Sequence, residues 1–132
     1  MSESSLRIAL VSRDAKKPAL VEWASSWREA LSCHHLCGTG TTAGEVMQAC
    51  RRLQVEELLS GPKGGDLQIG ARIATRQLDA LVFFVGAESP HAHENDVQAL
   101  IRISLLTNIP FALNRASADH LAEAMLTVRA HV

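Results

Sequence analysis

Ala80-Leu81-Val82-Phe83-Phe84-Val85 is the stretch that decides the fold. All six side chains are apolar, so a strand formed by them must be buried on both of its faces. Strands of this kind are typical of the middle of a parallel sheet, which carries helices on both sides. The run therefore predicts an α/β protein in which this strand is central.

The remaining strands are predicted from other short apolar runs. They cover residues 7–12, 34–38, 55–59 and 109–113. A helix-like segment follows each of the five strands. This order predicts a five-stranded parallel sheet with helices on both faces and right-handed crossovers, a doubly wound three-layer sandwich. We expect residues 1–6 to be a short disordered lead-in and residues 7–132 to form a single domain.

The helices are predicted from apolar residues that recur at helical spacing. The first has Pro18 in its first turn and carries Leu20, Trp23, Trp27 and Leu31 on one face. The second covers residues 42–53, with Val46, Ala49, Cys50 and Leu53 inward. The third is capped by Asp66 and buries Ile69, Gly70, Ile73 and Ala74. The fourth begins at Asp96 after a polar loop, and the fifth covers residues 116–130.

The composition excludes several classes of function. The formal net charge is −1 and aromatic residues make up 4% of the chain, so neither a basic surface nor a stacking surface for nucleic acid is expected. No apolar run approaches the roughly 20 residues that span a bilayer. The polar start Met1-Ser2-Glu3-Ser4-Ser5 is unlike a signal peptide. Together with three cysteines, an odd number, these features predict a cytoplasmic protein.

Two glycine-containing loops follow the second and third predicted strands. Gly38-Thr39-Gly40-Thr41-Thr42 is called the threonine loop, and Ser60-Gly61-Pro62-Lys63-Gly64-Gly65-Asp66 the aspartate loop. Glycines let backbone N–H groups converge on an anion, and the helix that follows turns its positive end toward it. The hydroxyl groups add neutral donors. A carboxylate repels phosphate, so Asp66 is expected to have a separate task, such as taking a proton.

The sequence disfavours three other kinds of ligand site. Cys33, His35 and Cys37 share one face of a strand and are a candidate metal cluster, but no second ligand pair with zinc-like spacing follows. The threonine loop matches the dinucleotide fingerprint through Gly38, Gly40 and Ala43, although no acid ends the next strand as that fingerprint requires. A nucleoside triphosphatase loop is excluded because no Lys-Ser or Lys-Thr pair follows the glycines.

The motifs resemble those of the methylglyoxal synthase family. The threonine loop, the string from Leu59 to Gln68 and the string His93-Glu94-Asn95-Asp96-Val97-Gln98-Ala99-Leu100 come in that family's order and spacing. The similarity runs from about Ile8 to Asp119. It implies conversion of dihydroxyacetone phosphate to methylglyoxal and inorganic phosphate, without metal or organic cofactor, by a cytoplasmic homohexamer.

The resemblance also implies roles for single residues. Asp66 matches the family's base, His93 its electrophile, and Asp96 a second acid that orients His93 or relays a proton. The residues that match the phosphate cradle are Lys17, Thr39, Thr41, Thr42, Ser60 and the Gly61 amide. Each residue also has a plainer interpretation. Asp66 and Asp96 would cap helices, while His93, Lys17 and Lys63 would be solvated side chains.

The chain departs from the family pattern at two positions near the predicted site. Arg13 stands where typical members have a histidine, and Gly86-Ala87 where they have an acid-proline pair. Arginine keeps the positive charge but does not transfer protons near neutral pH, so Arg13 is interpreted as a possible substrate contact. Two alternatives stay open. One is a non-catalytic module that senses a phosphorylated metabolite, as the allosteric domain of carbamoyl-phosphate synthetase does, and the other is an enzyme for a different sugar phosphate.

Overall fold

The computed structural model describes residues 5–86 and 94–126. Five strands form one sheet in the order β3-β2-β1-β4-β5, and every neighbouring pair is parallel. The strands are β1 (Arg7–Ser12), β2 (His35–Gly38), β3 (Val55–Glu57), β4 (Ala80–Phe84) and β5 (Phe111–Ala112). The predicted five-stranded parallel sheet is confirmed.

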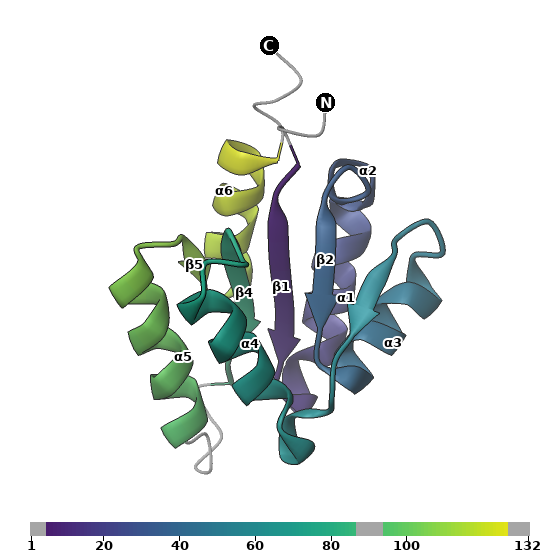
Figure 1. Cartoon of the computed structure of the whole chain (residues 1–132). Helices are drawn as coiled ribbons and strands as arrows, with labels where there is room; N and C mark the ends of the chain where they lie inside the picture. The colour runs from purple at the N-terminus through teal and green to yellow at the C-terminus, as the bar shows by residue number, and fades with distance from the viewer. Residues whose placement is uncertain (1–4, 87–93, 127–132) are drawn as a thin grey trace.

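Helices cover both faces of the sheet, as predicted (Figure 1). They are α1 (Lys17–Ser26), α2 (Arg28–Leu31), α3 (Gly40–Ala49), α4 (Gly65–Ala74), α5 (Glu94–Thr107) and α6 (Arg115–Met125). Two 3-10 turns precede α1 and α4: η2 (Asp14–Lys16) and η3 (Gly61–Lys63). In Figure 1, α4 and α5 lie in front of the sheet, and α1, α3 and α6 lie behind it.

The side chains of the two central strands alternate between two apolar clusters, because successive residues of a strand point to opposite faces. Leu10 and Val82 belong to the cluster packed under α1, α3 and α6. Val11 and Phe83 belong to the cluster under α4 and α5. The run 80–84 is thus buried on both faces, as expected for a central parallel strand.

Several predicted boundaries are wrong. The single helix predicted around Trp27 is divided there, because Trp27 has φ −110° and ψ 20°, outside the helical range. The helix predicted for residues 42–53 begins at Gly40 and ends at Ala49, and the helix expected to begin at Asp96 begins at Glu94. The predicted strands 55–59 and 109–113 are shorter, covering Val55–Glu57 and Phe111–Ala112.

Two predicted core positions are also wrong, since Ala49 and Ala74 are exposed at the ends of α3 and α4. The predicted lead-in falls partly outside the described residues, and its last residue, Leu6, packs against the core. Within residues 5–86 and 94–126, no helix combines the length and apolar character needed to cross a membrane.

The parallel arrangement brings the carboxyl ends of all five strands to one edge, at the bottom of Figure 1. Ligands of open α/β sheets bind outside this edge. Arg13, Thr39 and the aspartate loop follow the ends of β1, β2 and β3 respectively. The fold therefore gathers most of the predicted site residues at the edge where ligands of such sheets bind.

Candidate active site

The threonine loop and the aspartate loop lie against each other at this edge. The Gly40 N–H donates to the Leu59 carbonyl oxygen at 3.3 Å. A Cβ atom on Gly65 would overlap that same oxygen and would lie 2.9 Å from Cγ2 of Thr39. Only a glycine at position 65 lets the two loops approach this closely, so Gly65 is required for their packing.

The threonine loop leads from β2 into the first turn of α3. Thr39 occupies the N-cap position in an extended conformation, but its side chain does not cap the helix. Instead, its hydroxyl donates to Oγ1 of Thr42 at 3.3 Å, and Oγ1 of Thr42 lies 3.2 Å from Oγ of Ser12. Thr41 is exposed. The positive end of α3 lies at this edge of the sheet, an arrangement suited to an anion.

The aspartate loop is held by its own backbone. The Ser60 carbonyl accepts from the Lys63 N–H at 3.0 Å and from the Gly65 N–H at 2.9 Å. Gly64 has φ 111°, in the left-handed region that favours glycine. The Gln68 side chain adds a further link, because its Oε1 accepts from the Leu59 N–H at 2.8 Å. These hydrogen bonds close the loop on itself.

Asp66 lies in the first turn of α4, with 7% of its surface exposed. Its Oδ1 is 3.5 Å from the position of a Cβ on Gly61, so the carboxylate lies directly beside the start of η3. The capping interpretation is wrong, since Gly64 occupies the N-cap position. A carboxylate in the first turn is stabilised by the helix dipole.

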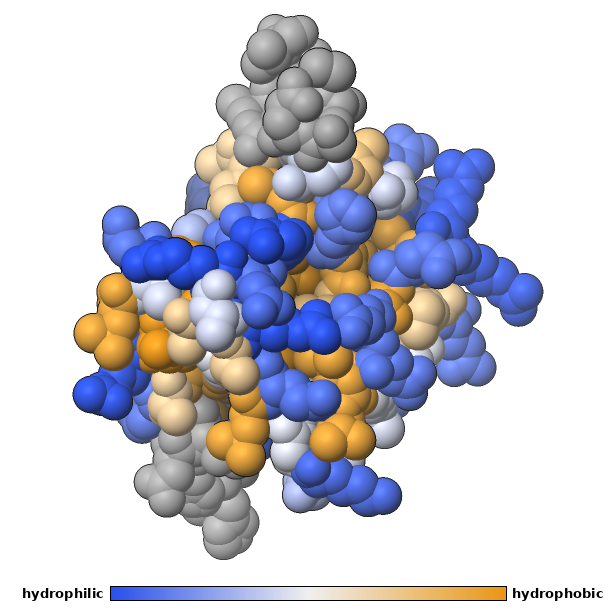
Figure 2. Space-filling model, viewed as in Figure 1, coloured by the Kyte–Doolittle hydropathy of each residue, from blue (hydrophilic) through white to orange (hydrophobic). Residues whose placement is uncertain are grey.

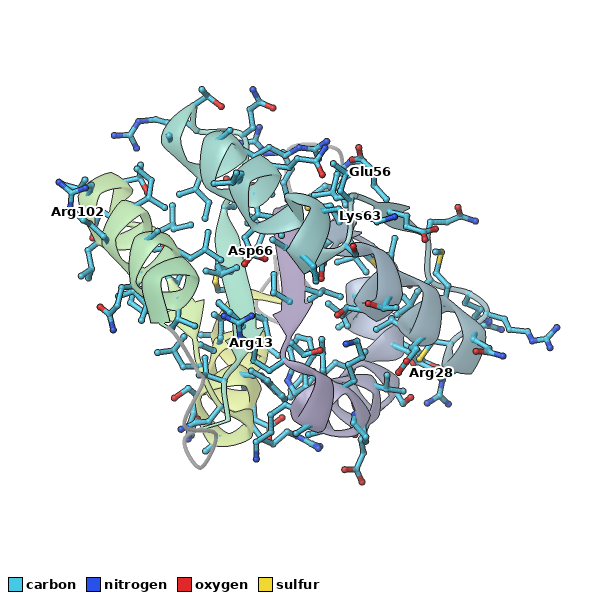
Figure 3. All side chains as sticks on the ribbon, turned by 90° about the horizontal axis from the view of Figure 1, so that it is seen from below. Arg13, Arg28, Glu56, Lys63, Asp66 and Arg102 are labelled. Carbon is cyan, nitrogen blue, oxygen red and sulfur yellow. The ribbon has the colours of Figure 1, made fainter. Side chains whose placement is uncertain are left out.

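Arg13 brings a guanidinium to the same edge. Its backbone N–H donates to the Phe84 carbonyl at 3.2 Å, and its Cζ lies 5.6 Å from the centroid of the Phe83 ring. Within the described part of the chain, its buried Nε has no hydrogen-bond acceptor. Figure 3, seen from below, places Asp66 and Arg13 near the middle of this end of the molecule and Lys63 nearer its rim.

The remaining predicted site residues are only partly placed. Lys17 is the first residue of α1 and is partly exposed, as is Ser60. Thr41 and Ser60 line an open cavity of about 640 Å³, together with Lys63, whose side chain is exposed. His93 lies outside the described residues. Asp96 belongs to the first turn of α5, and its side chain is outside the description too.

A salt bridge ties β3 to α4 behind the aspartate loop. Arg72 donates to both carboxylate oxygens of Glu56, at 2.8 and 2.7 Å. Hydrogen bonding from Arg72 lowers the pKa of Glu56, although partial burial opposes the shift. The neighbouring Cys37 thiol has its pKa raised, mainly by burial, while the charge of Arg72 opposes that shift.

The candidate metal cluster receives no support. Cys37 is buried, whereas Cys33 and His35 are exposed. Among residues 5–86 and 94–126, no group of three or more His, Cys, Asp or Glu side chains is placed to hold a metal ion.

The sequence interpretation missed two residues with clear contacts at the site. The sequence pattern places Ser12 only in a strand and Gln68 only in a motif. Their contacts join residues 30 and 9 positions apart. No local pattern marks such pairs.

Known proteins resemble the chain over most of its length. The model of the MGS-like domain family matches residues 19–113. A methylglyoxal synthase of Rhizobium rhizogenes is 47% identical over 118 residues, which cover 89% of this chain and 94% of that protein. The methylglyoxal synthase of Brucella ovis is 45% identical over 120 residues, covering 91% and 96% of the two chains.

The chain belongs to the methylglyoxal synthase family. The crystal structure of the methylglyoxal synthase from Elizabethkingia anophelis superimposes with a TM-score of 0.82 at 38% identity, covering 89% of this chain and 77% of that one. The family resemblance read from the motifs is thereby confirmed.

Proposed function

We propose that the protein is a methylglyoxal synthase that converts dihydroxyacetone phosphate to methylglyoxal and inorganic phosphate. The observation that carries the proposal is the 45–47% identity to methylglyoxal synthases over about nine tenths of the chain. The buried carboxylate of Asp66, next to two loops suited to an anion, supports it independently. A receptor for phosphate alone has no need of a buried carboxylate there.

The phosphate group is bound mainly by neutral donors in this proposal. They are the hydroxyls of Thr39, Thr41, Thr42 and Ser60 and the Gly61 N–H, and Lys17 adds one charge. The positive ends of α3 and α4 contribute further, since both helices begin at this edge. Donors fixed by the fold need no reorganisation when the charged ligand arrives.

Asp66 is the proposed base. It takes a proton from the hydroxymethyl carbon beside the ketone, and the C–H electron pair becomes the C=C bond of an enediolate. The hydroxyl group of the enediolate then loses its proton to the departing phosphate and becomes the aldehyde C=O, while the double bond shifts and the C–O bond to phosphate breaks. The enolate that is left takes back the proton held by Asp66 at its terminal carbon and becomes methylglyoxal. General base catalysis of this kind contributes about 10²–10⁴-fold to a rate.

His93 and Asp96 complete the proposed chemistry. His93 donates a hydrogen bond to the substrate carbonyl oxygen, where negative charge develops, and Asp96 orients His93 or relays a proton. Arg13 is proposed as a further substrate contact. Its guanidinium rests on Phe83 with a buried N–H still lacking an acceptor in the described part of the chain, and it supplies a fixed positive charge to the enediolate.

The decisive experiment is a turnover assay. Purified protein incubated with dihydroxyacetone phosphate should release inorganic phosphate and a dicarbonyl compound in equal amounts. Absence of turnover with phosphate binding intact would refute the enzyme and favour the metabolite-sensing module. Turnover of other sugar phosphates in preference to this one would favour the third alternative.

The cytoplasmic location and the homohexamer stay predictions that rest on the family resemblance. Figure 2 shows hydrophobic surface over α5 and near the lower end of α4. Exposed large apolar side chains there include Leu67, Leu105 and Leu106. Such a surface is consistent with assembly, and analytical ultracentrifugation would measure the number of subunits.

A further inference from the structure

A buried row of three hydroxyl groups runs from the end of β1 to the threonine loop. Ser12 at the end of β1 is 8% exposed, Thr42 in α3 is 1% exposed, and Thr39 is 4% exposed. Oγ of Ser12 and Oγ1 of Thr42 are 3.2 Å apart, and the Thr39 hydroxyl donates to Thr42 at 3.3 Å. Three buried hydroxyls in hydrogen-bond contact form one coupled unit.

The direction of these hydrogen bonds decides whether Thr39 can donate to an anion. A hydroxyl has a single proton and two lone pairs. As long as Thr39 gives its proton to Thr42, it presents only lone pairs to a phosphate oxygen, and lone pairs repel the anion. Thr39 can donate to phosphate only after its proton has rotated away from Thr42.

That rotation would leave the buried Thr42 oxygen without the donor it has now. Ser12 lies on the other side of Thr42, at a distance from which either hydroxyl can donate. If the Ser12 proton points to Thr42, the Thr42 oxygen is satisfied again. The proton of Thr42 is then available to Thr39 or to the anion.

We propose that Ser12 is a positioning residue for the phosphate site: its hydroxyl donates a hydrogen bond to the Thr42 oxygen when the anion binds, so that Thr39 can turn its own proton from Thr42 to the anion. The inference rests on the proposed function, because it takes phosphate to be the ligand of the threonine loop. Only hydroxyl rotation is involved, with no bond broken and no charge moved.

The test is the affinity for inorganic phosphate, measured by isothermal titration calorimetry on the full chain. Ser12→Ala should weaken phosphate binding roughly threefold to tenfold, the range of one lost net hydrogen bond. The KM for dihydroxyacetone phosphate should rise by a similar factor while kcat stays within about twofold. Ser12→Thr keeps the hydroxyl and should bind phosphate within about twofold of the wild type.

Ser104→Ala is the matched control. Ser104 is fully buried in α5, and its hydroxyl has no hydrogen-bond partner among the described residues. The same atom is therefore removed from an equally buried place outside the hydroxyl row. This variant should bind phosphate as the wild type does.

A double-mutant cycle with Thr42→Val separates the hydroxyl row from a general packing effect. If Ser12 acts through Thr42, then Ser12→Ala should have no further effect on phosphate affinity once Thr42 is valine. Full additivity of the two changes, or phosphate binding by Ser12→Ala equal to that of the wild type, would overturn the inference. A wild-type protein that binds no phosphate would overturn the proposed function itself, and this inference with it.

Discussion

The threonine loop and the aspartate loop both contain glycines that allow close packing, but only the aspartate loop also contains a glycine with a positive φ. In the threonine loop, Gly38 and Gly40 have no positive φ, and a Cβ there would lie 2.9 Å from the Leu10 oxygen and 3.2 Å from the Leu58 oxygen. These glycines allow close packing of strands and loop. In the aspartate loop, Gly64 has φ 111° and turns the chain so that α4 can begin.

The two loops also differ in the chemical groups that they carry. The threonine loop presents hydroxyls and a helix end, which suits it to hold an anion. The aspartate loop turns back on itself and places one buried carboxylate beside Gly61, at the same edge of the sheet. Changes to the hydroxyls of the threonine loop should therefore alter affinity, and changes to Asp66 should alter turnover.

Asp66→Asn is expected to have the largest effect. It removes the proposed base while keeping the size of the side chain, so kcat should fall by a factor of about 10²–10⁴. The affinity for inorganic phosphate should be retained or improved, since a negative charge beside the anion is lost. Phosphate release and calorimetry would measure the two quantities, and turnover within tenfold of the wild type would show that the base is another residue.

Gly65→Ala should damage both loops at once. The new Cβ would overlap the Leu59 carbonyl oxygen, so the backbone must shift, at a cost of about 2–3 kcal/mol in the free energy of unfolding. Phosphate affinity and turnover should fall together because Thr39 is displaced. Urea denaturation would measure the loss of stability.

Gly44→Ala is the control for that change. No atom lies within 4 Å of a Cβ at this position in α3. Alanine in a helix interior is more favourable than glycine, so the variant should gain about 0.5–1 kcal/mol. If both alanine variants had the same stability, the close approach of the two loops would not need a glycine at position 65.

The sequence predicts the architecture well because the relevant signals are local. The apolar run 80–85 requires burial on both faces, and the structure places residues 80–84 in an interior strand, paired with β1 on one side and β5 on the other. The glycine strings likewise mark the two loops. Each of these features depends on residues that are adjacent in the chain.

The errors arise where a local pattern competes with tertiary contacts. The helical pattern of apolar residues continues to Leu53, yet α3 ends at Ala49, and the Leu53 N–H instead donates to the Cys50 carbonyl in a turn. Trp27 fits a helical stripe, but its Nε1 donates to Asp119 on α6 at the point where the helix is divided. The contact of Ser12 with Thr42 depends on how β1 and α3 pack, which no spacing in the sequence shows.

Thr39→Val should sharpen the assignment of binding to the threonine loop. The substitution keeps the shape of the side chain and removes one donor to the proposed phosphate. A hydrogen bond to a charged group contributes about 1.5–3 kcal/mol, so phosphate affinity should fall about 10–100-fold. The kcat at saturating substrate should change much less. A variant that lowers kcat as strongly as Asp66→Asn would contradict the separation of roles between the loops.

Glu56→Gln should have the smallest effect, because it changes the salt bridge between β3 and α4 and no residue of either loop. The Glu56 side chain is 56% exposed, so its salt bridge with Arg72 should contribute only about 0.5 kcal/mol at neutral pH. Hydrogen bonding from Arg72 holds the pKa of Glu56 below its ordinary value of 4.5 in the folded protein. The contribution is therefore complete above that value and is lost as the pH falls through the lower, folded pKa.

Urea denaturation of the wild type and of Glu56→Gln should show a difference in the free energy of unfolding at neutral pH that disappears in acid. The two proteins should bind phosphate with the same affinity. A gap that does not depend on pH would mean that the glutamate acts through packing, and a weaker affinity for phosphate would extend the anion site to β3.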